Sequence, residues 1–258
     1  MTGTDRLPLP NTPISPLLVS YCNNRYGAVL SALYGFWSSR DAVALSATRA
    51  RRDAYSVVTF NESATTRVQN DFTSSPGQLI SQMLPQTSGG NVINFRAALT
   101  RAQSLIQTHW SSDRYEYFGL LYSYPGDHVL PRAPVIIFLS AIDCNIADDP
   151  VYNLCRMCVR LGKALAFHSV SFGTNTHSTS LRRMAEIAHE VYASAPRDAL
   201  PIGRGNPCGY TSAIDSARNL LTKVTRQQSE IVPSISLPKF CRELTSVIKY
   251  SPLKHGPH

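Results

Sequence analysis

The feature that most constrains this chain is the alternation of short apolar runs with longer stretches of helical periodicity. The clearest runs cover residues 54–60 (AYSVVTF), 134–140 (PVIIFLS) and 166–172 (AFHSVSF), and each is bounded by polar residues or glycine. Runs of this length and composition predict strands buried on both faces of a parallel sheet. A weaker run over residues 16–21 (PLLVSY) predicts a fourth strand.

Amphipathic patterns lie between and after these runs. Residues 26–37 and 94–110 each place their apolar side chains on one stripe of a helix. The same periodicity predicts helices over residues 150–165, 178–194 and 211–224. Alternating strands and helices predict an α/β fold, namely a doubly wound, mostly parallel central sheet with helices on both faces.

One domain accounts for most of the chain. With 258 residues, of which 43% are apolar and 16% charged, the chain can bury a sizeable core. We expect an irregular segment over residues 1–15, the domain over 16–226 and a partly irregular tail over 227–258. The aromatic-rich stretch 111–132 predicts either a surface insertion or a segment added by an imperfect gene model, because connections between a helix and a central strand are usually short.

Several features predict a cytoplasmic location, with the nucleus as the alternative. No run approaches the roughly 18 apolar residues of a membrane span, so no membrane association is expected. The N-terminal residues include an acid and early prolines where a secretory signal needs an apolar segment. The six cysteines are widely spaced in a long chain, which is typical of reduced thiols.

The net charge of +8 would favour nucleic acid, but the distribution of that charge argues against it. The 25 Lys and Arg residues are scattered and never form a run of five. We interpret the densest cluster, Arg49, Arg51 and Arg52, as a solvated face. Nucleic-acid binding stays a low alternative whose signature would be a steep salt dependence.

Six sequence blocks share their order and spacing with a known domain family. The blocks cover residues 25–37 (RYGAVLSALYGFW), 51–61 (RRDAYSVVTFN), 70–79 (NDFTSSPGQL), 88–99 (SGGNVINFRAAL), 133–140 (APVIIFLS) and 167–173 (FHSVSFG). Their succession resembles a von Willebrand factor type A domain of the fungal-type branch. The resemblance implies a Rossmann-like fold with a Mg²⁺ or Mn²⁺ site at the carboxyl ends of the strands, where an acidic residue of a partner protein completes the coordination.

The residues that the resemblance aligns with the family's metal site are mostly replaced. The family's Asp-x-Ser-x-Ser motif falls on Leu18, Ser20 and Cys22, so that only Ser20 keeps its ligand type. Ile93 takes the position of a Thr, and Ala141 that of an Asp. A neutral hydroxyl cannot compensate for dehydrating a divalent cation, so no metal and no other cofactor is expected.

Two nearby carboxylates leave a displaced, weak site open. Asp143 and Asp148 follow the strand predicted at 134–140, and with Ser20 they are the residual candidates for weak Mg²⁺ or Mn²⁺ binding. Cys155 and Cys158 have the spacing of a redox or zinc half-site, but no second pair accompanies them. We interpret them as buried helix thiols.

The sequence leads to three hypotheses of function. The first is a non-enzymatic protein-interaction module of von Willebrand A type that binds a protein partner without a bridging metal. The second is a degenerate paralogue, or an imperfect reading frame of a metal-binding relative, with little activity of its own. The third, an uncharacterised hydrolase, ranks lower because Gly-x-Ser-x-Gly, phosphate-loop and dinucleotide motifs are absent. We therefore expect no catalytic residues.

Overall fold

The computed structural model describes residues 12–46, 53–84, 92–110, 134–173, 177–196, 199–200 and 208–214. The helices are α1 (Ser15–Cys22), α2 (Arg25–Ser46), α3 (Pro76–Met83), α4 (Phe95–Trp110), α6 (Asp149–Arg160) and α7 (Thr179–Ala193). The strands are β1 (Tyr55–Phe60), β2 (Ala64–Asp71), β3 (Val135–Ser140), β4 (Ala166–Gly173) and β5 (Gly209–Ile214). The expected insertion at 111–132, the tail at 227–258 and most of the segment 1–15 lie outside the described residues.

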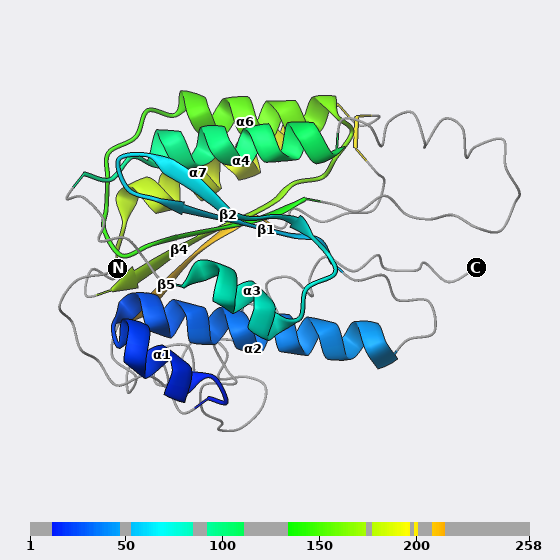
Figure 1. The fold of residues 1–258 in the computed structure, drawn as a ribbon. Coiled ribbons are helices and arrows are strands. Elements are labelled where there is room, and N and C mark those ends of the chain that lie inside the picture. The colour runs from blue at the N-terminus through cyan, green and yellow to red at the C-terminus, as the bar shows by residue number, and fades with distance from the viewer. Residues whose placement is uncertain are drawn as a thin grey trace, which may run out of the picture.

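The strands form two sheets. β1 and β2 pair antiparallel, while β3, β4 and β5 form a parallel sheet in the order β3-β4-β5. Figure 1 shows the strands as one layer between two groups of helices, with α4, α6 and α7 on one side and α1, α2 and α3 on the other. The α/β class predicted from the sequence is therefore confirmed, and helices cover both faces of the strand layer.

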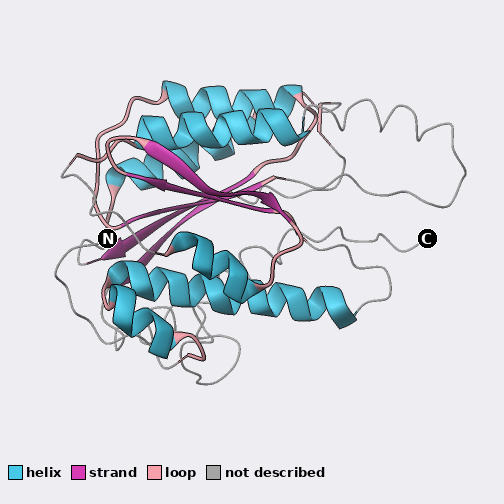
Figure 2. Ribbon diagram, viewed as in Figure 1, coloured by secondary structure: helices cyan, strands magenta, loops and turns pink. Residues whose placement is uncertain are grey.

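Figure 2 shows a group of helices on each side of the strands, and each group has its own hydrophobic core. The upper core joins α4, α6 and α7 to β3 and β4, and its largest fully buried side chains include Phe95 and Phe167. The lower core joins α1, α2 and α3, with Leu18 and Leu30 fully buried. Burial of this apolar surface is the main force that holds the layers together.

Local signals explain where two of the helices begin and end. In the capping box of α3, the N–H of Gln78 donates to Ser75 Oγ, and the N–H of Ser75 donates to the Gln78 side chain. Helix α6 has Pro150 in its first turn and ends before Gly162, whose φ of 70° favours glycine. Within the described residues, no helix has the length and apolar character needed to cross a membrane.

The strand predicted at residues 16–21 is wrong, because this segment forms helix α1. Its buried residues are Ser15, Leu18 and Cys22, whose spacings of three and four match one face of a helix. That face packs on the lower core, which includes Leu30 of α2. Packing against α2 has thus overridden a weak preference for strand in a short apolar run.

Two further expectations need correction. The run at 54–60 does form a strand, but its neighbour is the antiparallel β2, whose polar sequence gave no strand signal. Residues 61–63 make the tight turn between them, where the Asn61 N–H donates to the Ser63 carbonyl oxygen. The helix expected at 211–224 is wrong over its described part, because residues 211–214 belong to strand β5.

Candidate functional site at the carboxyl ends of the strands

The carboxyl ends of β1 and β3 are joined through Asn94 and its neighbours. The backbone N–H of Asn94 donates to the Asn61 carbonyl oxygen just after β1 (2.7 Å), and its side-chain amide donates to the Glu62 carbonyl oxygen (3.3 Å). Asn94 Oδ1 also accepts from the Ala97 N–H in the first turn of α4. One residue therefore anchors the helix start to the β1–β2 turn.

The next link connects this loop to the segment after β3. The thiol of Cys144 donates to the Ile93 carbonyl oxygen at 3.3 Å. Ser140, the last residue of β3, accepts from the Ile142 N–H and turns the chain away from the strand. Ala141 and Ile93, two positions that the resemblance assigns to the metal site, thus lie on segments that meet at this sheet end.

Exposed apolar side chains flank that contact. Val92 precedes Ile93 and is 58% exposed, while Ile142 follows Ala141 and is 50% exposed. We call Val92 and Ile142 the apolar rim. Exposed apolar side chains that form a contiguous patch mark binding surfaces, whereas single ones are common on any protein surface.

The carboxylate of Asp143 already has protein donors on both oxygens. Its Oδ1 accepts from the Ser178 hydroxyl at 2.7 Å and from the Cys144 N–H at 3.1 Å. Its Oδ2 accepts from the N–H and the hydroxyl of Thr179 at 3.2 and 3.3 Å. A cation at this carboxylate would have to compete with these four donors.

The electrostatic state of Asp143 follows from these contacts. Partial burial acts to raise its pKa, but hydrogen bonds from Ser178, Ser180 and Thr179 outweigh that effect and leave the pKa below its ordinary value. The first turn of α7 lies at the same place, where the positive end of the helix dipole favours an anion. Asp143 therefore stays ionised and ties the loop after β3 to α7.

Asp148 forms an ion pair with Arg183 of α7. Its Oδ2 accepts from the Nε and Nη2 atoms of Arg183 at 3.2 and 2.9 Å, and the same guanidinium donates to Glu190 at 2.8 Å. Glu190 in turn accepts from the Tyr152 hydroxyl at 2.7 Å. These contacts join the start of α6 to α7, so Asp148 serves as a structural ion-pair partner.

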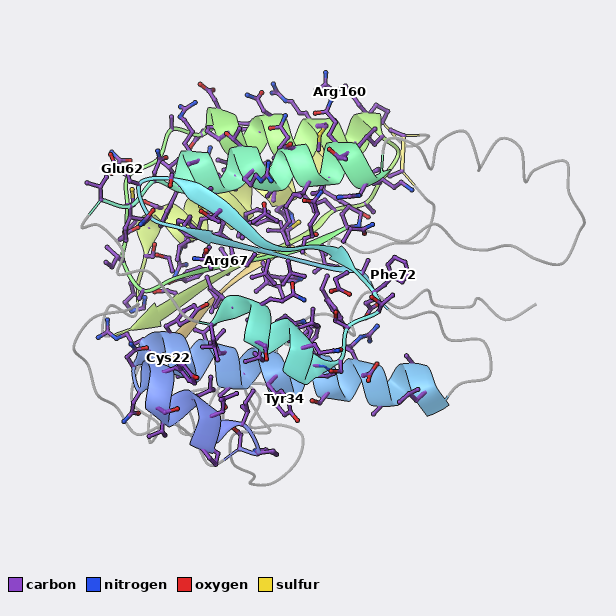
Figure 3. The ribbon with its side chains drawn as sticks, viewed as in Figure 1. Cys22, Tyr34, Glu62, Arg67, Phe72 and Arg160 are labelled. Atoms are coloured by element: carbon purple, nitrogen blue, oxygen red, sulfur yellow. The ribbon has the colours of Figure 1, made fainter. Side chains whose placement is uncertain are left out.

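The three positions of the expected first motif lie on α1 instead of after a strand. Leu18 and Cys22 are buried in the lower core, and burial raises the pKa of the Cys22 thiol. Ser20 is exposed and donates to the Leu17 carbonyl oxygen of its own helix. In Figure 3, Cys22 and Glu62 lie at the same end of the molecule, on opposite sides of the strands. The structure therefore does not bring Leu18, Ser20 or Cys22 into contact with Ile93 or Ala141.

Other candidate groups are buried away from this site. Cys155 and Cys158 lie in the upper core, where burial raises both thiol pKa values, that of Cys158 to about 12. Burial also lowers the pKa of His168 in β4 to about 4. Among the described residues, no group of three or more His, Cys, Asp or Glu side chains is arranged to hold a metal ion.

Sequence reasoning missed the residues that build this sheet end. Asn61, Asn94 and Ser178 act through backbone hydrogen bonds and helix capping, and single polar residues in loops gave no motif. The available signals were Asn94 before a helical pattern and Ser178 before another, both typical of helix N-caps. Neither signal predicts that the two caps lie beside Cys144 and Asp143.

No protein-family model matches the chain, and no curated protein matches it. Among solved structures, the chain is similar to the proximal thread matrix protein 1 of the mussel byssus, with a TM-score of 0.40 and 10% identity. That match covers 66% of this chain and 41% of the mussel protein's chain. A likeness this weak carries no argument about function.

Proposed function

We propose that this protein is a non-enzymatic protein-interaction module that binds a protein partner at the sheet end through the apolar rim. The observation that carries the proposal is the pair of exposed side chains, Val92 and Ile142, on either side of the Cys144–Ile93 contact. Because each side chain is about half exposed, burying both in an interface would contribute roughly 1.5–3 kcal/mol before the costs of association. The rim would thus act as the anchor of a larger interface.

The proposed mode of binding does not use a metal ion. The oxygens of Asp143 are occupied by donors from Ser178, Thr179 and Cys144, and Asp148 is paired with Arg183. Of the other positions that the resemblance assigns to the metal site, Ile93 and Ala141 are apolar. The remaining three, at residues 18, 20 and 22, lie on α1. Chelators should therefore leave binding unchanged.

The resemblance to the von Willebrand A family belongs to this proposal. The support is the order β1-β2-α3-α4-β3-α6-β4-α7-β5, the parallel sheet and the helices on both sides of the strands. In the proposed fold the two sheets are halves of one doubly wound sheet. A cytosolic or nuclear location is part of the same proposal and rests on the spacing of the six cysteines.

Site-specific photo-crosslinking tests the function. A benzoyl-phenylalanine at position 142, in cells that express the protein, should capture a defined partner, whereas the same group at the exposed Leu45 of α2 should not. With the purified partner, Ile142→Asp should weaken binding about tenfold or more, because a charge replaces a desolvated apolar anchor. Leu45→Asp is the matched control and should leave the affinity unchanged.

The remaining outcomes distinguish the alternatives. Loss of binding in chelator, restored by Mg²⁺ or Mn²⁺, would contradict the metal-independent mode. Equal capture from positions 142 and 45 would contradict a specific site at the rim. Capture at neither position, in cells that express the folded protein, would favour the degenerate paralogue with little activity of its own.

A further inference from the structure

Two carboxylates flank the apolar rim, one on each side. On the side of Val92, Glu62 lies in the turn between β1 and β2, and its carbonyl oxygen accepts from the Asn94 side chain at 3.3 Å (Figure 3). On the side of Ile142, Asp143 follows directly in the sequence. Glu62 and Asp143 are both exposed. We call Glu62, Val92, Ile142 and Asp143 the sheet-end strip.

The turn that carries Glu62 is closed by hydrogen bonds. The Ser63 N–H donates to the Asn61 side chain at 3.2 Å, and the Asn61 N–H donates to the Ser63 carbonyl oxygen at 2.9 Å. The bond from Asn94 ties the same turn to the start of α4. The backbone that presents Glu62 is thus ordered before any partner binds, which lowers the entropic cost of binding there.

Neither carboxylate of the strip forms an ion pair with another described residue. The ion pairs in this part of the chain belong to Arg40 and Arg183, whose acceptors are other carboxylates. The four donors to Asp143 are two hydroxyls and two backbone N–H groups, all of them neutral. Hydrogen bonds therefore stabilise the negative charge of Asp143 without neutralising it.

The arginines that follow the strip in α4 and α7 leave its carboxylates unpaired. The guanidinium of Arg182 lies over the Tyr210 ring, 5.1 Å from its centroid. Arg183 is engaged with acidic side chains of α6 and α7. Arg96, in the first turn of α4, is exposed and forms an ion pair with neither carboxylate. The strip therefore keeps its negative charge on a chain whose net charge is +8.

The strip combines two apolar side chains with a negative charge at either end. An apolar side chain of a partner would contact Val92 and Ile142, and a Lys or Arg beside it would lie near Glu62 or Asp143. Opposite charges across an interface fix the register of binding, while like charges disfavour wrong partners. A basic segment is attracted at the strip, whereas the remainder of the chain carries an excess of positive charge.

A cation of the partner and a metal ion would use Asp143 differently. A metal ion coordinates carboxylate oxygens directly and would displace the donors that occupy them. An ammonium or guanidinium group acts on the carboxylate through its charge, at about 4–6 Å and with those donors in place. The contacts of Asp143 thus oppose a metal ion but preserve its attraction for a basic side chain.

We propose that the sheet-end strip binds a basic segment of the partner protein, in which Lys or Arg flanks an apolar side chain. The inference rests on the proposed function, because it names the chemistry of the partner at the same site. The apolar side chain of the partner packs on Val92 and Ile142, and its cations face Glu62 and Asp143. Charge then determines which segment binds, while the apolar rim supplies the contact area.

Selection from a displayed library of random peptides tests the inference on the whole chain. Peptides that bind the wild type and lose binding in Ile142→Asp report on the rim, and we expect them to carry Lys or Arg next to apolar residues. Their affinity should fall about threefold in Glu62→Gln and about tenfold or more in Glu62→Lys, since a surface charge pair is lost or reversed. Glu186→Lys makes the same reversal at an exposed position of α7 and should change the affinity less than about twofold.

Other results would overturn the inference. Rim-dependent peptides that are rich in Asp or Glu, or that show no charge preference, would leave the proposed binding site standing and remove its preference for basic segments. The absence of any rim-dependent peptide would contradict both the inference and the proposed function. Self-association in sedimentation experiments that is lost in Ile142→Asp would assign the strip to a second copy of the chain.

The dependence on salt separates charge from shape at Glu62. The difference in affinity between wild type and Glu62→Gln should shrink at about 0.5 M salt, because exposed charges are then screened. A difference that persists at this ionic strength would show that Glu62 acts without its charge and would contradict the inference.

Discussion

Asp143 accepts a 2.7 Å hydrogen bond from the hydroxyl of Ser178, and this contact joins the loop after β3 to the first turn of α7. Ser178 Oγ at the same time accepts from the Leu181 N–H at 3.1 Å, so that one hydroxyl caps the helix and binds the carboxylate. The pairing means that a cation would have to displace protein donors from this carboxylate, which lies near two positions that the resemblance assigns to a metal site. Substitutions of Asp143 can therefore distinguish a structural role of this carboxylate from a role in metal binding.

Replacing Asp143 should destabilise the fold without any metal present. Asp143→Asn removes the charge that accepts from Ser178 and Thr179 at a helix N-terminus, with an expected loss of about 1 kcal/mol at neutral pH. Chemical denaturation in a chelating buffer measures this loss. Asp149→Asn, at an exposed carboxylate in the first turn of α6, is the matched control and should cost less.

The effect of Asp143→Asn should depend on pH in a defined direction. The folded-state pKa of Asp143 lies below its unfolded value, so its stabilising contribution is full above about pH 4 and is lost as the pH falls through the folded-state pKa. The difference between wild type and variant should therefore shrink in acid. A difference that grows below pH 4 would contradict the assigned contacts.

His168 should make the protein less stable on mild acidification. Burial lowers its folded-state pKa from 6.5 to about 4, so between these values the unfolded chain binds the proton more readily than the folded chain does. Stability should fall by about 2 kcal/mol between pH 7 and pH 5 from this group alone. Denaturant titrations at the two pH values measure the change, and His168→Leu should remove most of it.

The thiols should differ in reactivity according to burial. Cys155 and Cys158 lie in the upper core with raised pKa values, so an alkylating reagent at pH 8 should modify them only on global unfolding. Cys144 is partly exposed and should react in the native state. Peptide mapping by mass spectrometry distinguishes these sites. Fast native labelling of Cys155 or Cys158 would contradict their burial, and Leu154→Ala, which loosens the same core, should accelerate their labelling.

Magnesium and manganese should not bind tightly at the sheet end. Because protein donors occupy both oxygens of Asp143, titration calorimetry should give no saturable heat in the micromolar range. Saturable binding that is abolished by Asp143→Ala but kept in Asp149→Asn would show a cation site and contradict this prediction.

The sequence predicted the elements whose periodicity is strong. Residues 94–110 and 178–194 alternate at helical spacing, and α4 and α7 match these ranges within a residue or two. The runs at 134–140 and 166–172 form the parallel pair β3 and β4, of which β4 is buried on both faces from Ala166 to Ser171 and β3 is partly buried. The secondary structure of such segments can be predicted from the spacing of their apolar side chains alone.

Where the sequence pattern is weak, the secondary structure depends on contacts with neighbouring elements. Strand β2 has a polar sequence and forms because the Asn61–Ser63 turn returns the chain along β1. The expected site likewise depended on where residues 18–22 lie, and that position is set by packing on α2.

The sequence by itself therefore determined the α/β class and the helices and strands with strong periodicity. Only the tertiary structure decided that residues 16–21 form a helix, that Asp143 is paired with Ser178, and that β1 pairs with the polar strand β2. The physical reason is that these features depend on contacts between residues distant in the chain. A short apolar run such as PLLVSY suits a strand and a helix almost equally, so the surrounding packing selects between them.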